Sequence, residues 1–377
     1  MDALKQVRIS RRALAHNFAL CRDRAGAQGL VALVKADAYG HGMMECARLF
    51  TDLGAAGLAV ADAWEGVRLR EAGFTLPVYI LAGLAPQTVS ALISYDLDPL
   101  VSDPDMLEAL NAEAIRQGKT LAVHLKVDVG MGRQGALPED FAALARRAAQ
   151  SPGLRVAGLK AHLPKADDRA SDHSTRAAAA FAEACAAAQS LLPYPCARHL
   201  ANSGGLLYVD AAHFELARPG IALYGCYPDG AAGRASAAKS GETPLWPAMS
   251  WAAKILLVRR LPAGHTIGYD CTYTTDRPTT TAVLPVGYSD GCIRKLSNRG
   301  QVLIQGRRAP VLGRVSMNLT VVDVTHIPGV QAGDEAVLLG RQGEDEISAD
   351  ELAGWMETIN YEALCLIGRL NQRVYTD

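Results

Sequence analysis

The sequence predicts an α/β protein with two parts: an N-terminal (β/α)8 barrel of the TIM type, followed by a C-terminal domain made mostly of β-strands. Two observations carry this prediction. Short apolar runs alternate with Ala/Leu-rich helical stretches over the first two-thirds of the chain, which indicates βαβ units and a parallel sheet. Short β-type runs between Gly, Pro and Asp turns then fill most of the last third. Two domains are the natural expectation for 377 residues.

Eight β-rich runs make up the predicted barrel. They lie at 30–34, 56–60, 78–82, 99–101, 121–127, 155–159, 198–201 and 214–217. Eight such units in about 220 residues match the length of a closed barrel. An open, doubly wound sheet is the alternative. Because the fourth and seventh runs show the pattern least clearly, a count of seven or nine strands stays open.

The stretches between these runs have the composition of helices. Examples span 12–25, 43–53, 103–117, 137–150 and 173–192. Asp103 precedes Pro104, which is typical of a helix start, because the aspartate can cap free N–H groups and proline tolerates the first helical position.

The segment 226–246 is rich in small residues and has no apolar period, so we expect the domain boundary there. The later β-type runs lie at 255–258, 280–284, 301–304, 311–312, 320–324 and 336–339, and one late helix is expected around 348–359. The predicted domains are the barrel over 10–235 and a β-rich domain over 236–377, which residues 1–9 join.

Composition excludes several classes of function. A net charge of −1 gives no electrostatic reason to expect nucleic acid or an anionic membrane as a partner. The N-terminal MDALKQVRIS lacks the apolar core of a signal peptide, and no run approaches the length of a membrane span. The eight cysteines are scattered without a C-x-x-C pair, so we expect no metal site and a reducing, cytoplasmic location.

Polar residues follow several of the predicted barrel strands. Barrel enzymes collect their active sites from loops at the C-terminal ends of the strands. The residues expected at that mouth are Lys35, Asp128, Arg133, His162, Asn202, Ser203, Arg218 and Gly220. A lysine, a histidine, two arginines and a Ser-Gly pair should therefore converge on one site.

Lys35 is the candidate nucleophile. It follows four apolar residues, so its stem should be buried, and burial lowers the pKa of a lysine because it disfavours the charged form. A neutral amine can form a Schiff base with a carbonyl group. The alternative is a structural lysine whose amine reaches solvent at the barrel rim.

The loops after the last two strands suit a phosphate group. They carry Asn202-Ser203-Gly204-Gly205 and Gly220-Ile221, and barrels commonly bind phosphate with these two loops. Backbone N–H groups beside glycines, together with a hydroxyl, suit a phosphate ester. A phosphate site opposite a Schiff-base lysine indicates pyridoxal phosphate (PLP) as the cofactor.

The fifth strand adds a second cation. Period-2 alternation places His124, Lys126 and Asp128 on the inward face, so Lys126 should lie near Arg133. Two neighbouring cations need a compensating anion. The alternative is a network in which Lys126 binds only Asp128 or His124 and fills the barrel.

Eight motifs in order resemble the alanine racemases. They are VALVKADAYGHG, KVDVGMGRQG, HLANSGG, RPGIALYG, IGYDCTY, LPVGYSDG, GRVSMNLT and NYEALC, and the resemblance covers nearly the whole chain. It implies a PLP enzyme of fold type III that interconverts L-alanine and D-alanine. It also implies a head-to-tail homodimer in which the C-terminal domain of one subunit completes the active site of the other.

The resemblance also implies roles for individual residues. Lys35 would hold PLP, and Tyr269 would be the opposing base on the other face of the substrate's α-carbon. Arg218 would face the pyridine nitrogen and keep it unprotonated, and His162 would link Tyr269 to Arg218. The residues implied around the cofactor phosphate are Tyr39, Ser203, Gly220, Ile221 and Tyr361, and Asn202 is a further cofactor-binding candidate.

The substrate side of the site follows in the same way. Arg133 would contact the cofactor's phenolic oxygen and the substrate carboxylate, which the backbone of Met317 would also bind. Tyr288 and Arg294 would line the entrance. Many relatives carry a carbamylated lysine at the position of Lys126, which would supply the missing anion.

One departure from the family pattern concerns the substrate range. The chain has Asn318 where relatives usually have aspartate, which puts the preference for alanine in question. Another racemase or a decarboxylase of the same fold, a non-catalytic PLP carrier, and a Schiff-base enzyme without PLP are the alternatives. The pairing of Lys35 with Tyr269 favours the racemase.

Overall fold

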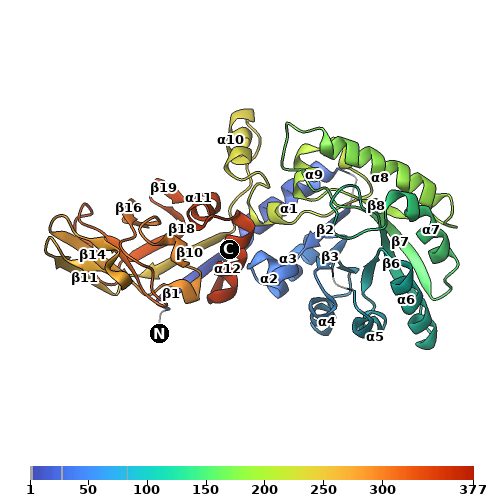
Figure 1. The fold of residues 1–377 in the computed structure, drawn as a ribbon, viewed down its shortest axis with the longest axis horizontal. Coiled ribbons are helices and arrows are strands. Elements are labelled where there is room, and N and C mark those ends of the chain that lie inside the picture. Colours follow the sequence, from blue (N-terminus) through green and yellow to red (C-terminus); the bar gives the residue numbers. More distant parts are fainter. Residues whose placement is uncertain (1–2, 27–28, 83) are drawn as a thin grey trace.

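The computed structural model describes residues 3–26, 29–82 and 84–377. Two bodies lie side by side along the long axis of the molecule (Figure 1). The barrel, coloured blue to green, is on the right, and the β-rich domain, coloured orange to red, is on the left.

The barrel contains the eight predicted strands in sequence order. The strands are β2 (Gly29–Leu33), β3 (Gly57–Val60), β4 (Val78–Ile80), β5 (Asp98–Val101), β6 (Leu121–Lys126), β7 (Leu154–Lys160), β8 (Ala197–His199) and β9 (Leu216–Ala217). Neighbouring strands are parallel, and β9 pairs with β2. Just beyond β9, the Arg218 N–H donates to the Ala201 carbonyl beyond β8, at 2.9 Å. This bond brings the two sheet ends together, so the closed barrel is confirmed and the open sheet is wrong.

Helices alternate with these strands as predicted. They are α1 (Arg11–Ala25), α3 (Met43–Asp52), α4 (Ala63–Glu71), α5 (Val89–Ser94), α6 (Pro104–Arg116), α7 (Pro138–Ala149), α8 (His173–Gln189) and α9 (Ser203–Tyr208). The expected cap of α6 is present, because the Asp103 carboxylate accepts from the Met106 N–H at 2.8 Å. Apolar side chains such as Phe141 and Phe181 are fully buried, so packing on the sheet stabilises the helices more than local propensity does.

The C-terminal domain is built on a seven-stranded, mixed sheet. Its strands are β1 (Lys5–Ser10), β10 (Met249–Lys254), β15 (Gln301–Ile304), β16 (Arg307–Pro310), β18 (Glu335–Gln342), β19 (Asp345–Ile347) and β20 (Arg373–Thr376). A three-stranded sheet adds β11 (Leu257–Leu261), β14 (Thr279–Leu284) and β17 (Thr320–Asp323), and a hairpin adds β12 (Thr266–Ile267) and β13 (Tyr273–Thr274). Two helices, α11 (Ala349–Met356) and α12 (Asn360–Leu370), pack on this domain.

Two of the predicted β runs in this domain are wrong. The run 255–258 lies across the break between β10 and β11, because the chain leaves one sheet and enters the other there. The run 311–312 is not a strand, since Val311 makes only a single bridge to Val322 after β16 has ended. The late helix is confirmed as α11, which Ser348 caps, but α12 was not predicted.

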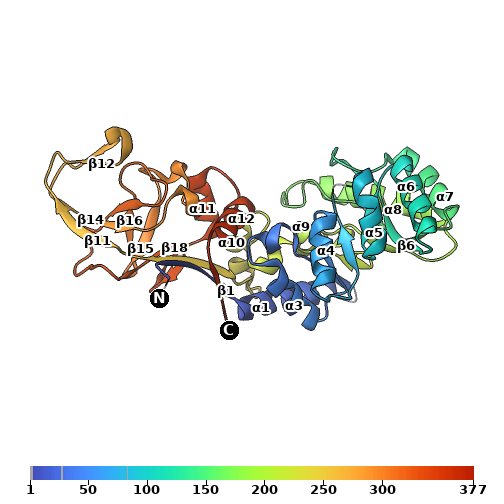
Figure 2. The same cartoon turned by 90° about the horizontal axis from the view of Figure 1, so that it is seen from below.

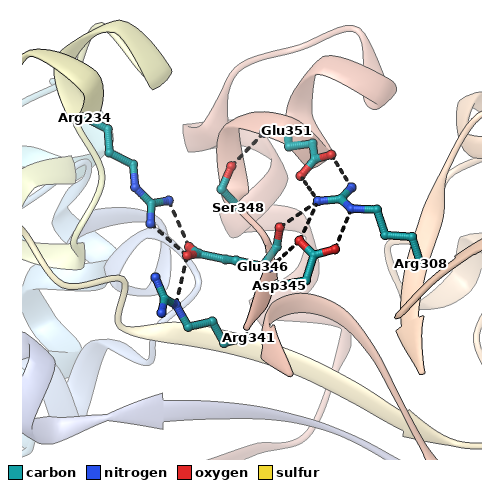
Figure 3. A network of polar contacts seen from close by, with 7 residues as sticks. All are labelled: Arg234, Arg308, Arg341, Asp345, Glu346, Ser348 and Glu351. Carbon is teal, nitrogen blue, oxygen red and sulfur yellow. Dashed lines mark hydrogen bonds and ion pairs between the residues drawn. The ribbon is translucent and has the colours of Figure 1, made fainter. Parts of the chain in front are cut away.

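The segment between the domains contains an unpredicted helix, α10 (Ala231–Ser240), seen at the top of Figure 1. It needs no apolar period, because alanine has the highest helix propensity. Figure 3 shows how its Arg234 is held: both terminal nitrogens of the guanidinium, Nη1 and Nη2, donate to Glu346 of the C-terminal domain, at 2.9 and 2.8 Å. Arg341 donates to the same carboxylate at 3.1 Å, so the helix is tied to β18 and β19.

The N-terminal strand belongs to the sheet of the C-terminal domain. β1 pairs antiparallel with β10 and parallel with β20, so both ends of the chain lie in this sheet. Arg8 on β1 donates to Glu335 on β18 at 2.6 Å. None of the helices in the described residues is long and apolar enough to cross a membrane.

Candidate functional site

A cavity of about 400 Å³ opens at the C-terminal ends of the barrel strands. Its lining consists of Leu33, Lys35, Ala61, Leu81, Ala82, Lys126, Arg133, Gln134, Lys160, His162 and Arg218. The expected convergence of a lysine, a histidine and two arginines is therefore found. No lining residue is acidic, so the cavity holds an excess of positive charge and suits an anionic ligand.

Lys35 lies directly beyond β2 and is half-buried. Burial lowers the pKa of its amine, and the neighbouring charge of Arg133 lowers it further. The amine lies 6.0 Å from the centre of the Tyr39 ring and makes no hydrogen bond to any residue the structure describes. The expected direction of the pKa shift is confirmed, and the amine is available to a ligand.

The chain turns in an unusual way after Lys35. The four residues 36–39, within α2 (Lys35–Tyr39), have φ values between 53° and 56°, so they form a left-handed turn. None of them is glycine, and such a turn costs about 1–2 kcal/mol per residue for L-amino acids. Glu65 accepts from the Ala36 N–H at 2.8 Å, and Asp37 accepts from the Met43 N–H at 2.8 Å.

The C-terminal strand also holds this turn. Arg373 of β20 donates to the Asp37 carboxylate and, at 3.1 Å, to the Gly40 carbonyl. α12 packs equally closely: a Cβ added at Gly40 would stand 2.3 Å from the Leu364 carbonyl oxygen. The position of Lys35 therefore depends on contacts with the second domain.

Lys126 points into the cavity, as the alternation of β6 predicts. Its amine donates to Gln134 at 3.3 Å. The alternative network is absent, because the Asp128 carboxylate accepts from loop N–H groups and His124 bonds to His199. Burial lowers the pKa of Lys126 to about 8, with Arg133 adding to the shift.

Arg218 is the most deeply buried cation of the site, with 2% of its surface exposed. One guanidinium nitrogen, Nη2, donates to the carbonyls of Ala161 and Leu200 at 2.9 and 3.2 Å. The other, Nη1, is buried and has no partner among the described residues. Burial lowers the pKa of Arg218 to about 9, which still leaves the group charged at neutral pH.

His162 lines the same cavity and is half-buried. Burial and the charge of Arg218 hold its pKa well below the usual value. The imidazole is therefore neutral at pH 7, with one nitrogen able to donate a hydrogen bond and the other able to accept one.

The loops after β8 and β9 meet around the Ser203 hydroxyl. It accepts from the N–H groups of Gly220 and Ala222 at 2.9 and 3.2 Å. A Cβ at Gly220 would stand 2.4 Å from the Tyr39 hydroxyl, so glycine is required there. Asn202 supports the loop, because its side chain accepts from the Gly205 N–H at 2.8 Å.

Two tyrosines complete this part of the site. Tyr39 and Tyr361 have ring centroids 6.1 Å apart, and Tyr361 comes from α12 of the C-terminal domain. Neither hydroxyl makes a hydrogen bond to a described residue, and burial raises the pKa of both, so they remain protonated donors. Ile221, which follows Gly220, is fully buried. Hydroxyls and backbone N–H groups gathered in this way suit a phosphate group.

Four residues of the expected site lie exposed on the C-terminal domain and do not line this cavity. Tyr269 is 67% exposed on a short turn between β12 and β13, at the end of the molecule away from the barrel (Figure 2). Met317 is 55% exposed, and Tyr288 and Arg294 are also exposed. Backbone bonds place Tyr288 beside Met317, so these two form one surface.

Asn318 is bonded locally. Its side-chain amide donates to the Ser289 hydroxyl at 2.8 Å, and that hydroxyl donates to the Met317 carbonyl at 2.8 Å. The Met317 N–H has no hydrogen-bond partner among the described residues. The loop thus keeps a free donor, although it carries no charge at position 318.

Lys160 is a cavity residue that the sequence analysis did not identify. It ends β7 and stands two positions before His162, so the period-2 alternation that leads to an inward His162 applies to Lys160 as well. Within the described residues no group of three His, Cys, Asp or Glu side chains is placed to hold a metal ion.

Comparison with known proteins gives one consistent result. The family model described as "Alanine racemase, N-terminal domain" matches residues 9–228, and "Alanine racemase, C-terminal domain" matches residues 248–375. The chain is 41% identical to the alanine racemase of Syntrophobacter fumaroxidans over 364 residues, which covers 96% of this chain and 95% of the relative.

Solved structures agree with this result. Alanine racemase from Streptomyces lavendulae, which produces D-cycloserine, superimposes with a TM-score of 0.93 at 35% identity, covering 100% of this chain and 98% of that one. A Bartonella henselae alanine racemase with covalently bound pyridoxal phosphate gives a TM-score of 0.89 at 28% identity, covering 100% of both chains.

Proposed function

The chain belongs to the alanine racemase family, and from this premise we propose that it interconverts L-alanine and D-alanine with PLP as its cofactor. The observation that carries the proposal is the cation-lined cavity at the barrel mouth. There a lysine amine with a lowered pKa lies near the Tyr39 hydroxyl, which has no partner in the described chain and can donate to a phosphate.

The residues present fit the cofactor. Gly220 leaves the space that a Cβ would fill beside the Tyr39 hydroxyl, and Arg218 keeps one buried nitrogen without a partner. Lys35 would hold PLP covalently, and Arg218 would face its pyridine nitrogen. The phosphate would be held by Tyr39, Ser203, Gly220, Ile221 and Tyr361, and Asn202 is a further cofactor-binding candidate.

When bound, PLP supplies an electron-withdrawing ring that makes the proton on the substrate's α-carbon removable. The chain's own residues move that proton. Racemisation needs a proton donor or acceptor on each face of the α-carbon, and we assign Lys35 to one face and Tyr269 to the other. Arg218 stays charged, so a ring nitrogen facing it stays unprotonated. The neutral His162 can link Arg218 to the Tyr269 hydroxyl.

The substrate carboxylate would bind to Arg133, which lines the cavity, and to the free N–H of Met317. Arginine suits a carboxylate because it can donate two parallel hydrogen bonds. Tyr288 and Arg294 would line the entrance. A carbamate on Lys126, as in many relatives, would offset part of the cation excess around Arg133.

The assignment of Tyr269 and Met317 requires a homodimer. Both side chains are more than half exposed, and neither lines the cavity of its own chain. We therefore propose that the C-terminal domain of a second copy completes each site. Such a shared site is compatible with the two-fold symmetry of most dimers.

We further propose that the barrel spans 10–235 and the β-rich domain 236–377, joined by 1–9. The pairing of β1 with β10 and β20 supports this division. All eight cysteines are free thiols, which suits a reducing, cytoplasmic location.

Borohydride reduction of the purified protein, followed by peptide mapping, tests this function. We expect a yellow protein that racemises either enantiomer of alanine, with the reduced cofactor on Lys35. A Lys35→Ala variant should lose the attachment and the activity. Attachment to a different residue would overturn the site assignment, and a colourless protein that binds no PLP would overturn the function.

A further inference from the structure

Lys160 is a buried lysine that the mechanism above does not use. It ends β7, where it pairs in register with Lys126 of β6 and His199 of β8. Only 4% of its surface is exposed, and it lines the same cavity as Lys35. An ionisable side chain in this position is rarely fully buried unless it has a partner.

No such partner exists among the described residues. The Lys160 amine makes no hydrogen bond or ion pair there, and none of the residues lining its cavity carries a carboxylate. Because the unmodified side chains around the cavity supply no partner for this amine, its partner is a group that occupies the cavity.

The surroundings specify the chemistry of that partner. The other ionisable groups lining the cavity are Lys35, Lys126, Arg133, His162 and Arg218, and all of them are basic. Burial, followed by the charge of Arg218, holds the pKa of Lys160 well below its usual value, so the empty cavity disfavours a charged amine. An anionic oxygen beside Lys160 would reverse that preference and accept its hydrogen bonds.

We propose that Lys160 is a ligand-binding residue, whose amine donates to an anionic oxygen of either the bound cofactor or the substrate carboxylate. The inference rests on the proposed function and assigns to that site a residue that no other observation identifies. A role in ligand binding and a role in folding also predict opposite effects of the Lys160 amine on the stability of the cofactor-free protein. An amine kept for a ligand lowers the stability of the empty protein, whereas an amine kept for packing raises it.

The Lys160→Met variant tests this, because it keeps an unbranched stem of nearly the same length and removes the amine. Three quantities are measured on wild type and variant: the Tm of the cofactor-free protein, the Kd for PLP, and the KM and kcat for L-alanine. Lys160→Gln is a second variant that keeps a donor without the charge. Lys239→Met, at an exposed lysine of α10 without a hydrogen-bond partner in the described chain, is the matched control.

We expect the cofactor-free Lys160→Met protein to be at least as heat-stable as wild type. If the partner is a cofactor oxygen, the Kd for PLP rises by about 10- to 100-fold, the usual worth of a hydrogen bond to a charged group. If it is the substrate carboxylate, KM rises by a similar factor while the Kd for PLP stays unchanged.

Unchanged Kd and KM in both variants, in a wild-type protein that binds PLP, would overturn the role of Lys160 alone. A lowered Tm without loss of affinity would also overturn it, because that result marks a packing role. A wild-type protein that fails to bind PLP would instead contradict the proposed function.

Discussion

At the scale of single residues, the site depends on groups that the fold leaves without protein partners. Lys35, Lys160 and one nitrogen of Arg218 all lie at the cavity without a hydrogen bond to the described chain. Elsewhere in proteins such groups are nearly always paired. Their concentration at one cavity indicates that the chain is built around an anionic ligand.

Gly220 gives a prediction at this scale. In Gly220→Ala the new Cβ would stand 2.4 Å from the Tyr39 hydroxyl, so the tyrosine or the loop must move. The backbone is strained as well, because Gly220 has φ −114° and ψ −92°, a combination outside the regions that alanine favours. We expect the Kd for PLP to rise at least about tenfold, since overpacking typically costs about 1–3 kcal/mol.

Fluorescence titration of the cofactor-free protein with PLP measures this effect. Gly354→Ala is the control, because a Cβ at this helical glycine meets nothing within 4 Å. It should leave the affinity unchanged and stabilise α11 slightly. Equal affinity in Gly220→Ala and wild type would show that the phosphate does not bind at this loop.

Sequence patterns alone predicted the location of many residues that line the cavity. Lys35, Arg133, His162 and Arg218 follow predicted strands, and the barrel rule brings such residues to one mouth. Lys160 was missed although it directly follows the predicted run 155–159, because a lysine at a strand end is usually solvated. Its burial depends on the side chains of neighbouring strands, and no local pattern specifies these.

At the scale of elements, the left-handed turn 36–39 is the main source of backbone strain at the site. Its residues are Ala, Asp, Ala and Tyr, and only the aspartate is among the residues that adopt this conformation readily. The turn therefore persists through the bonds of Asp37 and Glu65 and the packing of α12. Backbone strain of this kind is typical of functional sites, where surrounding structure holds it in place.

Asp37→Ala tests that explanation. The variant loses the bonds to the Met43 N–H and to Arg373, so we expect the free energy of unfolding to fall by about 2 kcal/mol. The Kd for PLP should rise as well, because the turn carries Lys35. Chemical denaturation and PLP titration measure the two effects.

Asp52→Ala, at an exposed aspartate with no bond to the described chain, is the control for this pair of measurements. Loss of stability with full cofactor affinity would contradict the idea that the turn positions Lys35. No change in either quantity would show that Asp37 does not hold the turn.

Sequence alone could not predict this turn, because none of its four residues is glycine, the usual signal for positive φ. The barrel elements were easier to predict, since each strand is a short apolar run between helical stretches. β1, β10, β20 and α12 were missed. These three strands pair with one another across long separations in the chain, and pairing of that kind leaves no local signal.

At the scale of the whole molecule, the two catalytic residues that we expect lie in different domains of one chain. Lys35 lies at the barrel mouth, and Tyr269 lies exposed on the C-terminal domain away from the barrel. We propose that the two halves of a site meet in a dimer, as the family resemblance implies, while the chain's own periodicity carries no information about a second copy. The central claim is therefore that each site combines residues of two chains.

Hybrid dimers test this claim most directly. Lys35→Ala and Tyr269→Phe chains carrying different affinity tags are co-expressed, and dimers containing one of each are isolated through both tags. Each variant alone should be inactive. If sites are shared between chains, the hybrid has one intact site and should show about half of the wild-type racemase activity per dimer. An inactive hybrid would contradict the account, because it would mean that Lys35 and Tyr269 of one site come from the same chain.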